Sequence, residues 1–470
     1  MNNSKLSGIF LSLSAAEIRQ LEKFLNSGLV YTYTEQLTLF HKLKEKHTEP
    51  SGWNKEKIYE ECFLNKKYDD KKMRYLVTDL TRNIEKFLVY LSSQNNSYLF
   101  NSQLAAELSK RKSEKAYRIL YNQFRQESEN TVVKDGDYYY YLFLNEHINL
   151  TAEIEKERRG EGTNIERVLD NLDKFYLAKK LQLCCEVYNV KNVMAINYKA
   201  FLLEEITSYL SKNSYDDSPI IQVYYKILMT LTQSDREEHF NDLRDLLLKH
   251  ENVFGKNDLR EMYQYVLNYC IKKINLGNIG FQRTLFEIYK IILENKVLLP
   301  DDRISQWDYK NIVTISMRLN EFDWTNEFIH QYKKFLNSEE RENAFSYNLA
   351  YLYFNRKDYS KTLNLLQKVE FTDLYYQLDS RVIVLKTYYE QNSDEAFYYH
   401  VSAFKNFIQR NKLISDYQRT IYTNLIRYAS KLVRYSGKRK KTEELKQQVE
   451  ENRQVADINW LLQKINEELI

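Results

Sequence analysis

Residues 349–369 read LAYLYFNRKDYSKTLNLLQKV, and this stretch decides the fold. Apolar and aromatic residues recur every three or four positions on both sides of the pair Asp358-Tyr359, which predicts one amphipathic helix before the pair and another after it. The small residues Ala350 and Thr362 stand where the two helices would cross closely. The stretch therefore predicts a helical hairpin with its turn at Asp358-Tyr359.

The hairpin pattern returns 34 residues further along the chain. The residues that then fall at corresponding places are Ile383, Val384, Ala396, His400 and Ala403. A preceding unit is marked by Phe322-Asp323-Trp324, one residue out of phase. This spacing resembles that of tetratricopeptide repeats, with Thr362 and His400 where an alanine and an aromatic residue are usual. Since such units cannot bury an apolar face alone, we expect them to stack.

The composition extends this expectation to the whole chain. Only ten glycines and three prolines occur in 470 residues, where ordinary usage would give about 55 of the two together. Glycine supplies positive-φ turns and proline supplies rigid loop stops, so a chain that lacks both is nearly all helix. We predict an all-α fold: an α-solenoid of helix hairpins, with tetratricopeptide-like units toward the C-terminus and a small helical N-terminal domain.

Shifts in pattern divide the chain into four predicted segments. They are a helical N-terminal domain at 1–95, a helix-hairpin array at 98–300, tetratricopeptide-like repeats at 301–435, and a basic turn with a C-terminal capping helix at 436–470. The polar, uncharged run 92–97 predicts the first linker. Helices are expected at 17–25, 35–46, 55–63 and 69–91. Ser14 and Glu17 have the spacing of a capping box, so we interpret the apolar run before them as part of the fold rather than as a signal peptide.

Charge and cysteine content limit the location and the partners. The chain carries 69 basic and 65 acidic residues, a net charge of +4, and the two signs are interspersed. This balance does not favour a protein driven by nucleic-acid binding. The four cysteines form no C-x-x-C pair, which predicts reduced thiols and a cytoplasmic location. No uncharged apolar run approaches 18 residues, so we expect no membrane span.

The sequence holds no recognisable motif for chemistry. A Walker loop, a G-x-S-x-G elbow, an H-E-x-x-H helix and an EF-hand loop are all missing. The seven histidines are dispersed. Paired carboxylates such as Asp301-Asp302 and Glu339-Glu340 stand at expected helix starts, where they complement the helix dipole. We predict that the chain is not an enzyme and that it needs no cofactor or metal.

The leading functional prediction is a scaffold that binds another protein. Successive first helices of the hairpins would line a concave face, and a peptide or helix of the partner would lie along it. The candidate partner-binding residues, in the phase set by the Asp358-Tyr359 turn, are Tyr347, Tyr351, Asn355, Arg381, Leu385, Tyr388 and Tyr389.

The alternative prediction is a nucleic-acid-binding regulator that uses residues 54–92. A short helix, a turn and a long helix could form a helix-turn-helix whose second helix meets DNA. The basic residues at that turn are Lys66, Lys67, Lys71, Lys72 and Arg74. The other interpretation of this cluster is a solvated surface in which Asp69 caps the long helix.

Several phrases along the chain together resemble one protein family. They occur in collinear order over nearly its full length: Leu13-Ser14-Ala15-Ala16-Glu17, Tyr68-Asp69-Asp70-Lys71-Lys72-Met73-Arg74, Asn268-Tyr269-Cys270-Ile271-Lys272-Lys273, Lys310-Asn311-Ile312-Val313, Tyr388-Tyr389-Glu390 and Phe404-Lys405-Asn406-Phe407-Ile408. The set is similar to a family of helical-repeat proteins of unknown function from Bacteroidetes-type bacteria. The resemblance implies a tetratricopeptide-like fold and a cytoplasmic location, and it implies no activity.

Overall fold

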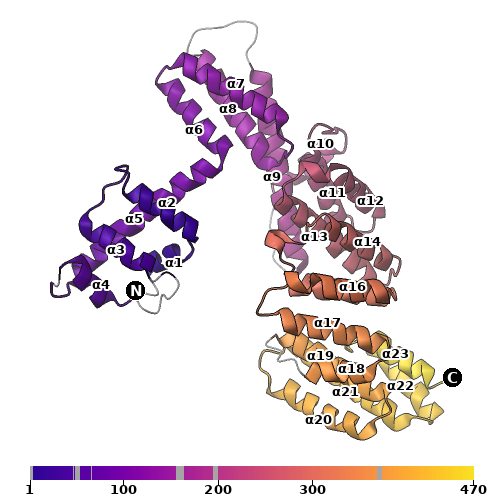
Figure 1. Ribbon diagram of the computed structural model, residues 1–470. Coiled ribbons are helices and arrows are strands. Elements are labelled where there is room, and N and C mark those ends of the chain that lie inside the picture. Colours follow the sequence, from indigo (N-terminus) through magenta and orange to yellow (C-terminus); the bar gives the residue numbers. More distant parts are fainter. Residues whose placement is uncertain are drawn as a thin grey trace. The chain divides into compact units, whose positions relative to one another are not determined.

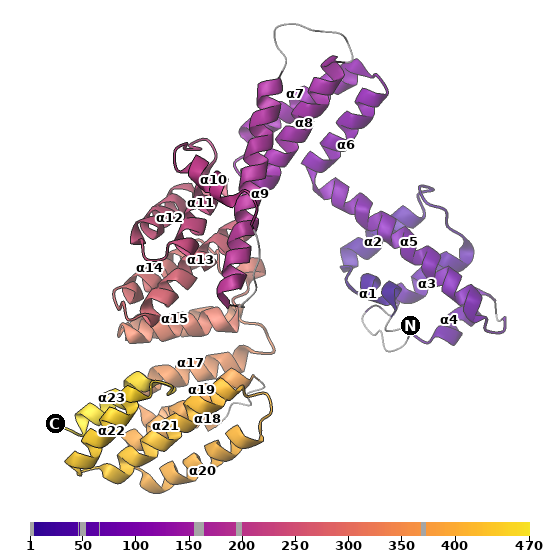
Figure 2. The same ribbon diagram turned by 180° about the vertical axis from the view of Figure 1, so that it is seen from behind.

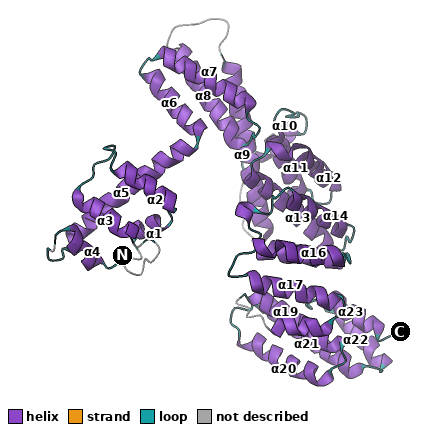
Figure 3. Cartoon of the chain, in the orientation of Figure 1, coloured by secondary structure: helices purple, strands orange, loops and turns teal. Residues whose placement is uncertain are grey.

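The computed structural model describes residues 4–45, 47, 53–64, 66–154, 164–193, 200–367 and 373–470. These residues form helices and no strand (Figure 3). A single isolated parallel bridge joins Ile304 to Leu336 within them. The predicted all-α fold class is therefore confirmed. None of the helices in these ranges has the length and apolar character needed to cross a membrane.

The chain divides into two compact units, Met1–Lys179 and Lys180–Ile470. Unit 1 contains α1 (Lys5–Leu11), α2 (Ala15–Leu25), α3 (Thr34–Glu45), α4 (Lys55–Cys62), α5 (Asp70–Asn95), α6 (Ser97–Lys110), α7 (Glu114–Asn130) and α8 (Gly136–Ile154). The division falls within α9 (Ile165–Val193).

Unit 2 contains the remaining helices (Figure 1). They are α10 (Leu203–Leu210), α11 (Pro219–Thr232), α12 (Glu237–His250), α13 (Lys256–Asn275), α14 (Phe281–Glu294), α15 (Gln306–Arg318), α16 (Phe322–Tyr332), α17 (Arg341–Asn355), α18 (Tyr359–Gln367), α19 (Leu374–Glu390), α20 (Asp394–Arg410), α21 (Asp416–Tyr435), α22 (Arg439–Glu451) and α23 (Ile458–Glu467), with short 3₁₀ turns η2 (Glu251–Val253), η3 (Pro300–Asp302) and η4 (Lys333–Phe335).

Local signals place the N-terminal helices of unit 1. The four predicted helices correspond to α2, α3, α4 and α5. The capping box is present, because the Ser14 hydroxyl accepts from the Glu17 amide at 3.2 Å and the Glu17 carboxylate accepts from the Ser14 amide at 2.7 Å. Leu21, Leu39 and Leu80 are fully buried in the core that α1 to α5 share.

The predicted linker at 92–97 is not a linker. Its polar residues extend α5 as far as Asn95, and α6 begins at Ser97, so only Asn96 lies between the two helices. The Asn96 side chain accepts from the Leu99 amide at 2.9 Å and caps α6. Because an uncharged polar run can continue an exposed helix as readily as it can form a loop, composition alone did not show that these residues are helical. The buried core formed by α1 to α5 extends as far as Phe87.

The hairpin around Asp358-Tyr359 is present in unit 2. Helix α17 ends at Asn355 and α18 begins at Tyr359. The Thr362 hydroxyl reaches the Ala350 carbonyl oxygen at 3.4 Å, so the two small residues do lie at the crossing. Val369 lies outside the described residues. Helix α17 packs against both helices of the preceding hairpin, α15 and α16. Figure 1 shows α16 next to α17, and Figure 2, seen from behind, shows α15 next to α17.

Helices of unit 2 pack on the next helix and on the next but one. Contacts join α11 to α13, α15 to α17 and α17 to α19 as well as consecutive helices. The last two helices share one apolar core with α19, α20 and α21, in which Leu378, Leu425 and Leu461 are fully buried. Helices of the predicted segments 301–435 and 436–470 therefore share one core.

Candidate partner-binding surfaces of the C-terminal helices

A lysine enclosed by aromatic rings links four helices of unit 2. We call Lys310 of α15, Tyr347 of α17, Tyr376 and Asp379 of α19 and Tyr422 of α21 the Lys310 cluster. The Lys310 ammonium lies 5.3 Å from the centroid of the Tyr347 ring and 5.0 Å from that of Tyr376, and it pairs with the Asp379 carboxylate. The Tyr422 hydroxyl donates to Asp379 at 3.2 Å. Cation–π attraction and the ion pair together hold the ammonium in place.

Two predicted partner-binding residues are buried inside the packing, which corrects the prediction for them. Tyr347 is 5% exposed within the Lys310 cluster, and burial raises the pKa of its hydroxyl well above the usual value. Leu385 is fully buried in the C-terminal core. The helix face that was predicted to be open packs at these two positions against neighbouring helices of the same chain. Neither residue can therefore contact a partner in this structure.

Tyr351 and Asn355 are half-buried on α17. The Asn355 amide donates to the Tyr351 carbonyl oxygen at 2.7 Å, one turn back along the helix. Burial, together with the nearby carboxylate of Asp457, raises the pKa of the Tyr351 hydroxyl to about 12. Asp457 immediately precedes α23, so the C-terminal segment contributes to the surroundings of Tyr351.

The predicted residues on α19 also have partners within the chain. The Arg381 guanidinium lies 4.3 Å from the centroid of the Phe407 ring, and burial lowers its pKa. The Tyr388 ring packs at 6.0 Å against His400. Tyr389 packs edge-on against Trp460 of α23 at 5.5 Å.

Helix α23 covers the C-terminal end of the α19 face that was predicted to bind a partner, and α20 packs on Arg381 and Tyr388 of the same face. In α23, the Trp460 indole N–H donates to Glu390 at 3.2 Å, and the Lys464 ammonium pairs with the same carboxylate at 2.9 Å. Just before the helix, Asp457 pairs with the buried Lys386. The seven predicted residues therefore do not form one open surface, because the chain's own last helix occupies much of the place.

An exposed row of aromatic rings lies at the starts of three helices. Trp307, Tyr375 and Tyr417 are each the second residue of α15, α19 and α21, and they are 39%, 53% and 65% exposed. The Trp307 and Tyr375 ring centroids are 5.9 Å apart. Tyr417 is on the same helix as Tyr422 and precedes it by five residues. The Tyr422 hydroxyl donates to Asp379 of α19, which follows Tyr375 by four residues. We call these three residues the aromatic edge.

Sequence reasoning missed the aromatic edge, although a local signal marks it. Each aromatic residue stands two positions after the residue that caps its helix. The pairs are Ser305 and Trp307, Asp373 and Tyr375, and Ser415 and Tyr417. In each pair the capping side chain accepts a backbone N–H of the first turn, which fixes the start of the helix and the direction in which the ring leaves it.

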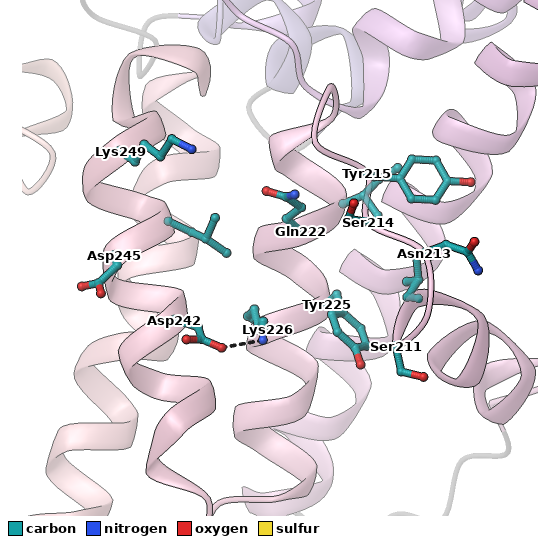
Figure 4. Close-up of a pocket in the computed structure, with 13 residues that line it drawn as sticks. Ser211, Asn213, Ser214, Tyr215, Gln222, Tyr225, Lys226, Asp242, Asp245 and Lys249 are labelled. Carbon is teal, nitrogen blue, oxygen red and sulfur yellow. Dashed lines mark hydrogen bonds and ion pairs between the residues drawn. The ribbon is translucent and has the colours of Figure 1, made fainter.

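A cavity of about 540 Å³ opens between α11, α12 and the loop after α10 (Figure 4). Its charged residues balance, since Lys226 pairs with Asp242 at 2.6 Å and Lys249 and Asp245 supply one further charge of each sign. Among its thirteen lining residues, all of them described, none is histidine or cysteine. The cavity therefore brings together hydroxyl, ammonium and carboxylate groups.

The N-terminal basic cluster lies on the surface of unit 1. Lys66, Lys67, Lys71 and Lys72 are exposed, and their ammonium groups have no ion-pair partner among the described residues. The fifth member, Arg74, pairs with Asp70 at 3.0 Å.

The start of α5 matches one of the two interpretations of this cluster. The Asp69 carboxylate accepts from the amides of Lys71 and Lys72 at 3.0 and 3.2 Å, so the predicted N-cap is confirmed. Helix α4 packs on α3. The first-turn amides that could hold a phosphate are therefore already bonded to a side chain.

The described residues do not assemble a metal site or a reactive thiol. No group of three or more histidine, cysteine, aspartate or glutamate side chains within them could hold a metal ion. All four cysteines are free and buried. Burial raises the pKa of Cys62 and of Cys270 to about 12, so these thiols stay protonated and unreactive near neutral pH.

No protein-family model matches the chain, and neither the curated proteins nor the solved structures contain a significant match. The resemblance to the Bacteroidetes-type family therefore stays a prediction, and the function has to be argued from the surfaces described above.

Proposed function

We propose that the chain is a non-catalytic, cytoplasmic scaffold that holds a second protein on the C-terminal helices of unit 2. The observation that carries the proposal is the aromatic edge. Tryptophan and tyrosine are the residues most enriched among those that dominate the energy of protein interfaces. Three such rings at equivalent helix positions, each more than a third exposed, present this kind of surface on a frame held by capped helices.

The proposed frame is an α-solenoid of tetratricopeptide-like hairpins. Support comes from the regular starts of α15, α17 and α19 at residues 306, 341 and 374. Further support comes from the Lys310 cluster, whose contacts join α15, α17, α19 and α21. In such a stack, residues at one helix position form a row that runs across the repeats. The aromatic edge occupies such a row at α15, α19 and α21, and Glu342 is the corresponding second residue of α17.

This proposal moves the docking surface away from the face predicted from the sequence. The predicted face would need Tyr389 and its neighbours to be free, and Trp460 packs on Tyr389. The aromatic edge needs no such rearrangement, because Tyr375 and Tyr417 are already more than half exposed.

The test compares two variants of the full-length tagged chain in its own cytosol. One carries Trp307→Ala, Tyr375→Ala and Tyr417→Ala together. The matched control is Tyr399→Ala, which removes a ring that is 81% exposed on α20. We expect specific proteins to co-purify with the wild type and with the control and to be lost from the triple variant. An unchanged set of proteins on a folded triple variant would disprove the proposal.

A further inference from the structure

We infer that the partner segment held by the aromatic edge is rich in lysine and arginine. The inference rests on the proposed docking function and specifies the chemistry of what docks. It depends on three observations: the charge around the edge, the state of the groups that carry this charge, and the way in which the chain already holds a cation beside it.

The helix starts that carry the aromatic edge are acidic, although the chain as a whole is basic. Residues 301–310, 373–379 and 412–419, at the starts of α15, α19 and α21, contain six acidic and four basic residues, and residues 339–342 at the start of α17 add three acidic residues and one basic residue. The complete chain, by contrast, has a net charge of +4. Complementary potentials attract and orient a partner of opposite charge. The local excess of carboxylates therefore favours a cationic segment.

Several of these carboxylates are available to a partner. Asp301, Glu339 and Asp416 are exposed and have no ion-pair partner among the described residues. Two of the five basic groups are committed to backbone carbonyls, since the Arg341 guanidinium donates to Leu336 at 3.0 Å and the Arg419 guanidinium donates to Ile408.

The other three basic residues leave the acidic excess in place. Lys310 is paired within its own cluster. Arg303 and Lys412 stay exposed at the edge.

The chain already binds a cation with this combination of groups. The Lys310 ammonium lies 5.7 Å from the centroid of the Trp307 ring, so one member of the aromatic edge already takes part in a cation–π contact. Tyr376, next to Tyr375 in the sequence, lies over the same ammonium, and Asp379 balances its charge. The edge presents the same residue types to solvent, with Tyr375 and Tyr417 not covered by any described cation.

The spacing of the rings suggests the pattern of the partner. The Trp307 and Tyr375 centroids are 5.9 Å apart. Side chains two residues apart on an extended segment leave on the same side and are separated by about 6.6–7 Å. The two ring planes are nearly perpendicular, at 88°. A segment with a cation at every second residue could therefore place one ammonium or guanidinium group over the face of one ring and the next group beside the other ring, within the roughly 6 Å that cation–π attraction requires.

The experiment measures binding of defined peptides to the full chain by fluorescence anisotropy. The probe is a labelled twelve-residue peptide in which lysine and serine alternate. The comparison peptides alternate glutamate with serine, glycine with serine, or carry the six lysines in one block. We expect the alternating lysine peptide to bind best, and the Trp307→Ala, Tyr375→Ala, Tyr417→Ala variant to weaken its binding about tenfold or more.

Two further variants separate the rings from general charge attraction. Replacing the same three residues by phenylalanine keeps the aromatic faces, so binding should stay within about threefold of the wild type. The Tyr399→Ala variant should bind as the wild type does. Equal peptide binding by the alanine triple variant, or equal binding of the glycine–serine peptide, would overturn the inference. A dimer of this chain that the triple variant abolishes would also overturn it, because a second copy would then be the occupant.

The two proposals can fail separately. If the triple variant loses its co-purifying proteins while no cationic peptide binds, the docking function stands and the stated partner chemistry is wrong. If the co-purifying proteins are unchanged in the triple variant, the docking function itself is wrong, whatever the peptides show.

Discussion

The Lys310 cluster and the aromatic edge use the same residue types with opposite outcomes. In the cluster, Tyr347 and Tyr376 close over Lys310, so rings and cation satisfy one another inside the chain. At the edge, Tyr375 and Tyr417 are more than half exposed, and no cation of the described residues lies over them. An aromatic residue therefore indicates a binding surface only when its own chain does not already cover it.

The difference follows from position along the helix. Tyr347 stands in the middle of α17, where α15 and α19 pack against it from both sides. Tyr375 and Tyr417 stand in the first turn of their helices, just after the cap, where neighbouring helices leave room. Substitutions in the two regions should consequently differ in kind: in the covered region they cost stability, and at the edge they cost binding.

The largest expected effect is the loss of stability when the covered tryptophan, Trp460, is replaced by alanine. The comparison is the same replacement at the more exposed Trp307. Trp460 is 8% exposed, packs on Tyr389 and donates to Glu390. Trp460→Ala should lower the free energy of unfolding by about 3–5 kcal/mol. Trp307→Ala, at the edge, should lower it by a smaller amount, about 1–2 kcal/mol, because the ring is partly exposed but still contacts Lys310 and Tyr375. Guanidinium denaturation followed by circular dichroism measures both, and equal losses would contradict the distinction between the two regions.

A smaller loss is expected when the Lys310 cluster loses its carboxylate. Asp379→Asn leaves the ammonium of Lys310 enclosed by rings without its counter-charge, which should cost about 1–3 kcal/mol of unfolding free energy. The double variant Lys310→Met, Asp379→Asn should lose less than Asp379→Asn alone, because methionine fills the site without a charge. Chemical denaturation of the single and double variants measures the coupling.

The control for these variants is an exposed ion pair at the start of α18. Lys361 pairs with Asp358 at 2.7 Å near the surface. Asp358→Asn removes the charge and keeps a capping side chain, so it should change stability by less than about 0.5 kcal/mol. If Asp379→Asn is as mild as Asp358→Asn, the Lys310 cluster does not depend on its carboxylate.

Sequence reasoning succeeded where the signal lies within a few residues. The Ser14 and Glu17 capping box and the turn at Asp358-Tyr359 each depend on neighbours in the chain, and both are present. The signal for the aromatic edge was equally local, since each ring stands two residues after a cap such as Ser305. It could have been found by searching for aromatic residues at that position.

Sequence reasoning failed where distant segments meet. Helical periodicity shows that Leu385 and Tyr389 lie on a helix face, but it does not show what covers that face. The cover is α23, held by contacts such as that of Lys386 with Asp457 and that of Tyr389 with Trp460, about 70 residues further along. No pattern within one helix reports such a pairing, so a predicted binding face became an internal contact.

A half-buried histidine next to the covered face should give unit 2 a pH-dependent stability. The His400 Nε2–H donates to the Arg381 carbonyl oxygen at 2.8 Å, so protonation would have to occur at the other ring nitrogen. Burial, and the nearby charge of Arg381, lower the pKa of His400 below 6.5 in the folded state. The unfolded chain then takes up this proton more readily, and stability is lost as the pH falls from about 7 to 5.

The variant His400→Gln keeps a donor for the same carbonyl oxygen and removes the titration. Its free energy of unfolding should fall less than that of the wild type between pH 7 and pH 5. Urea denaturation at each pH measures this difference. His239 and His250, whose pKa values are also lowered by burial, are present in both proteins and cancel in the comparison. Parallel pH profiles would show that His400 contributes nothing to the pH dependence.

The smallest effect on stability is expected at the exposed N-terminal lysines, whose ammonium groups have no ion-pair partner among the described residues. Replacing Lys66, Lys67, Lys71 and Lys72 by serine should change the free energy of unfolding by less than about 0.5 kcal/mol. Because Asp69 already occupies the first amides of α5, we expect the full chain to bind duplex DNA only weakly at about 50 mM salt and not at about 150 mM. Anisotropy titration of a labelled duplex at both salt concentrations measures this. Binding that persists at the higher salt and disappears in the quadruple variant would favour the nucleic-acid regulator over a solvated surface. Unit 1 would then be a second binding region in addition to the aromatic edge.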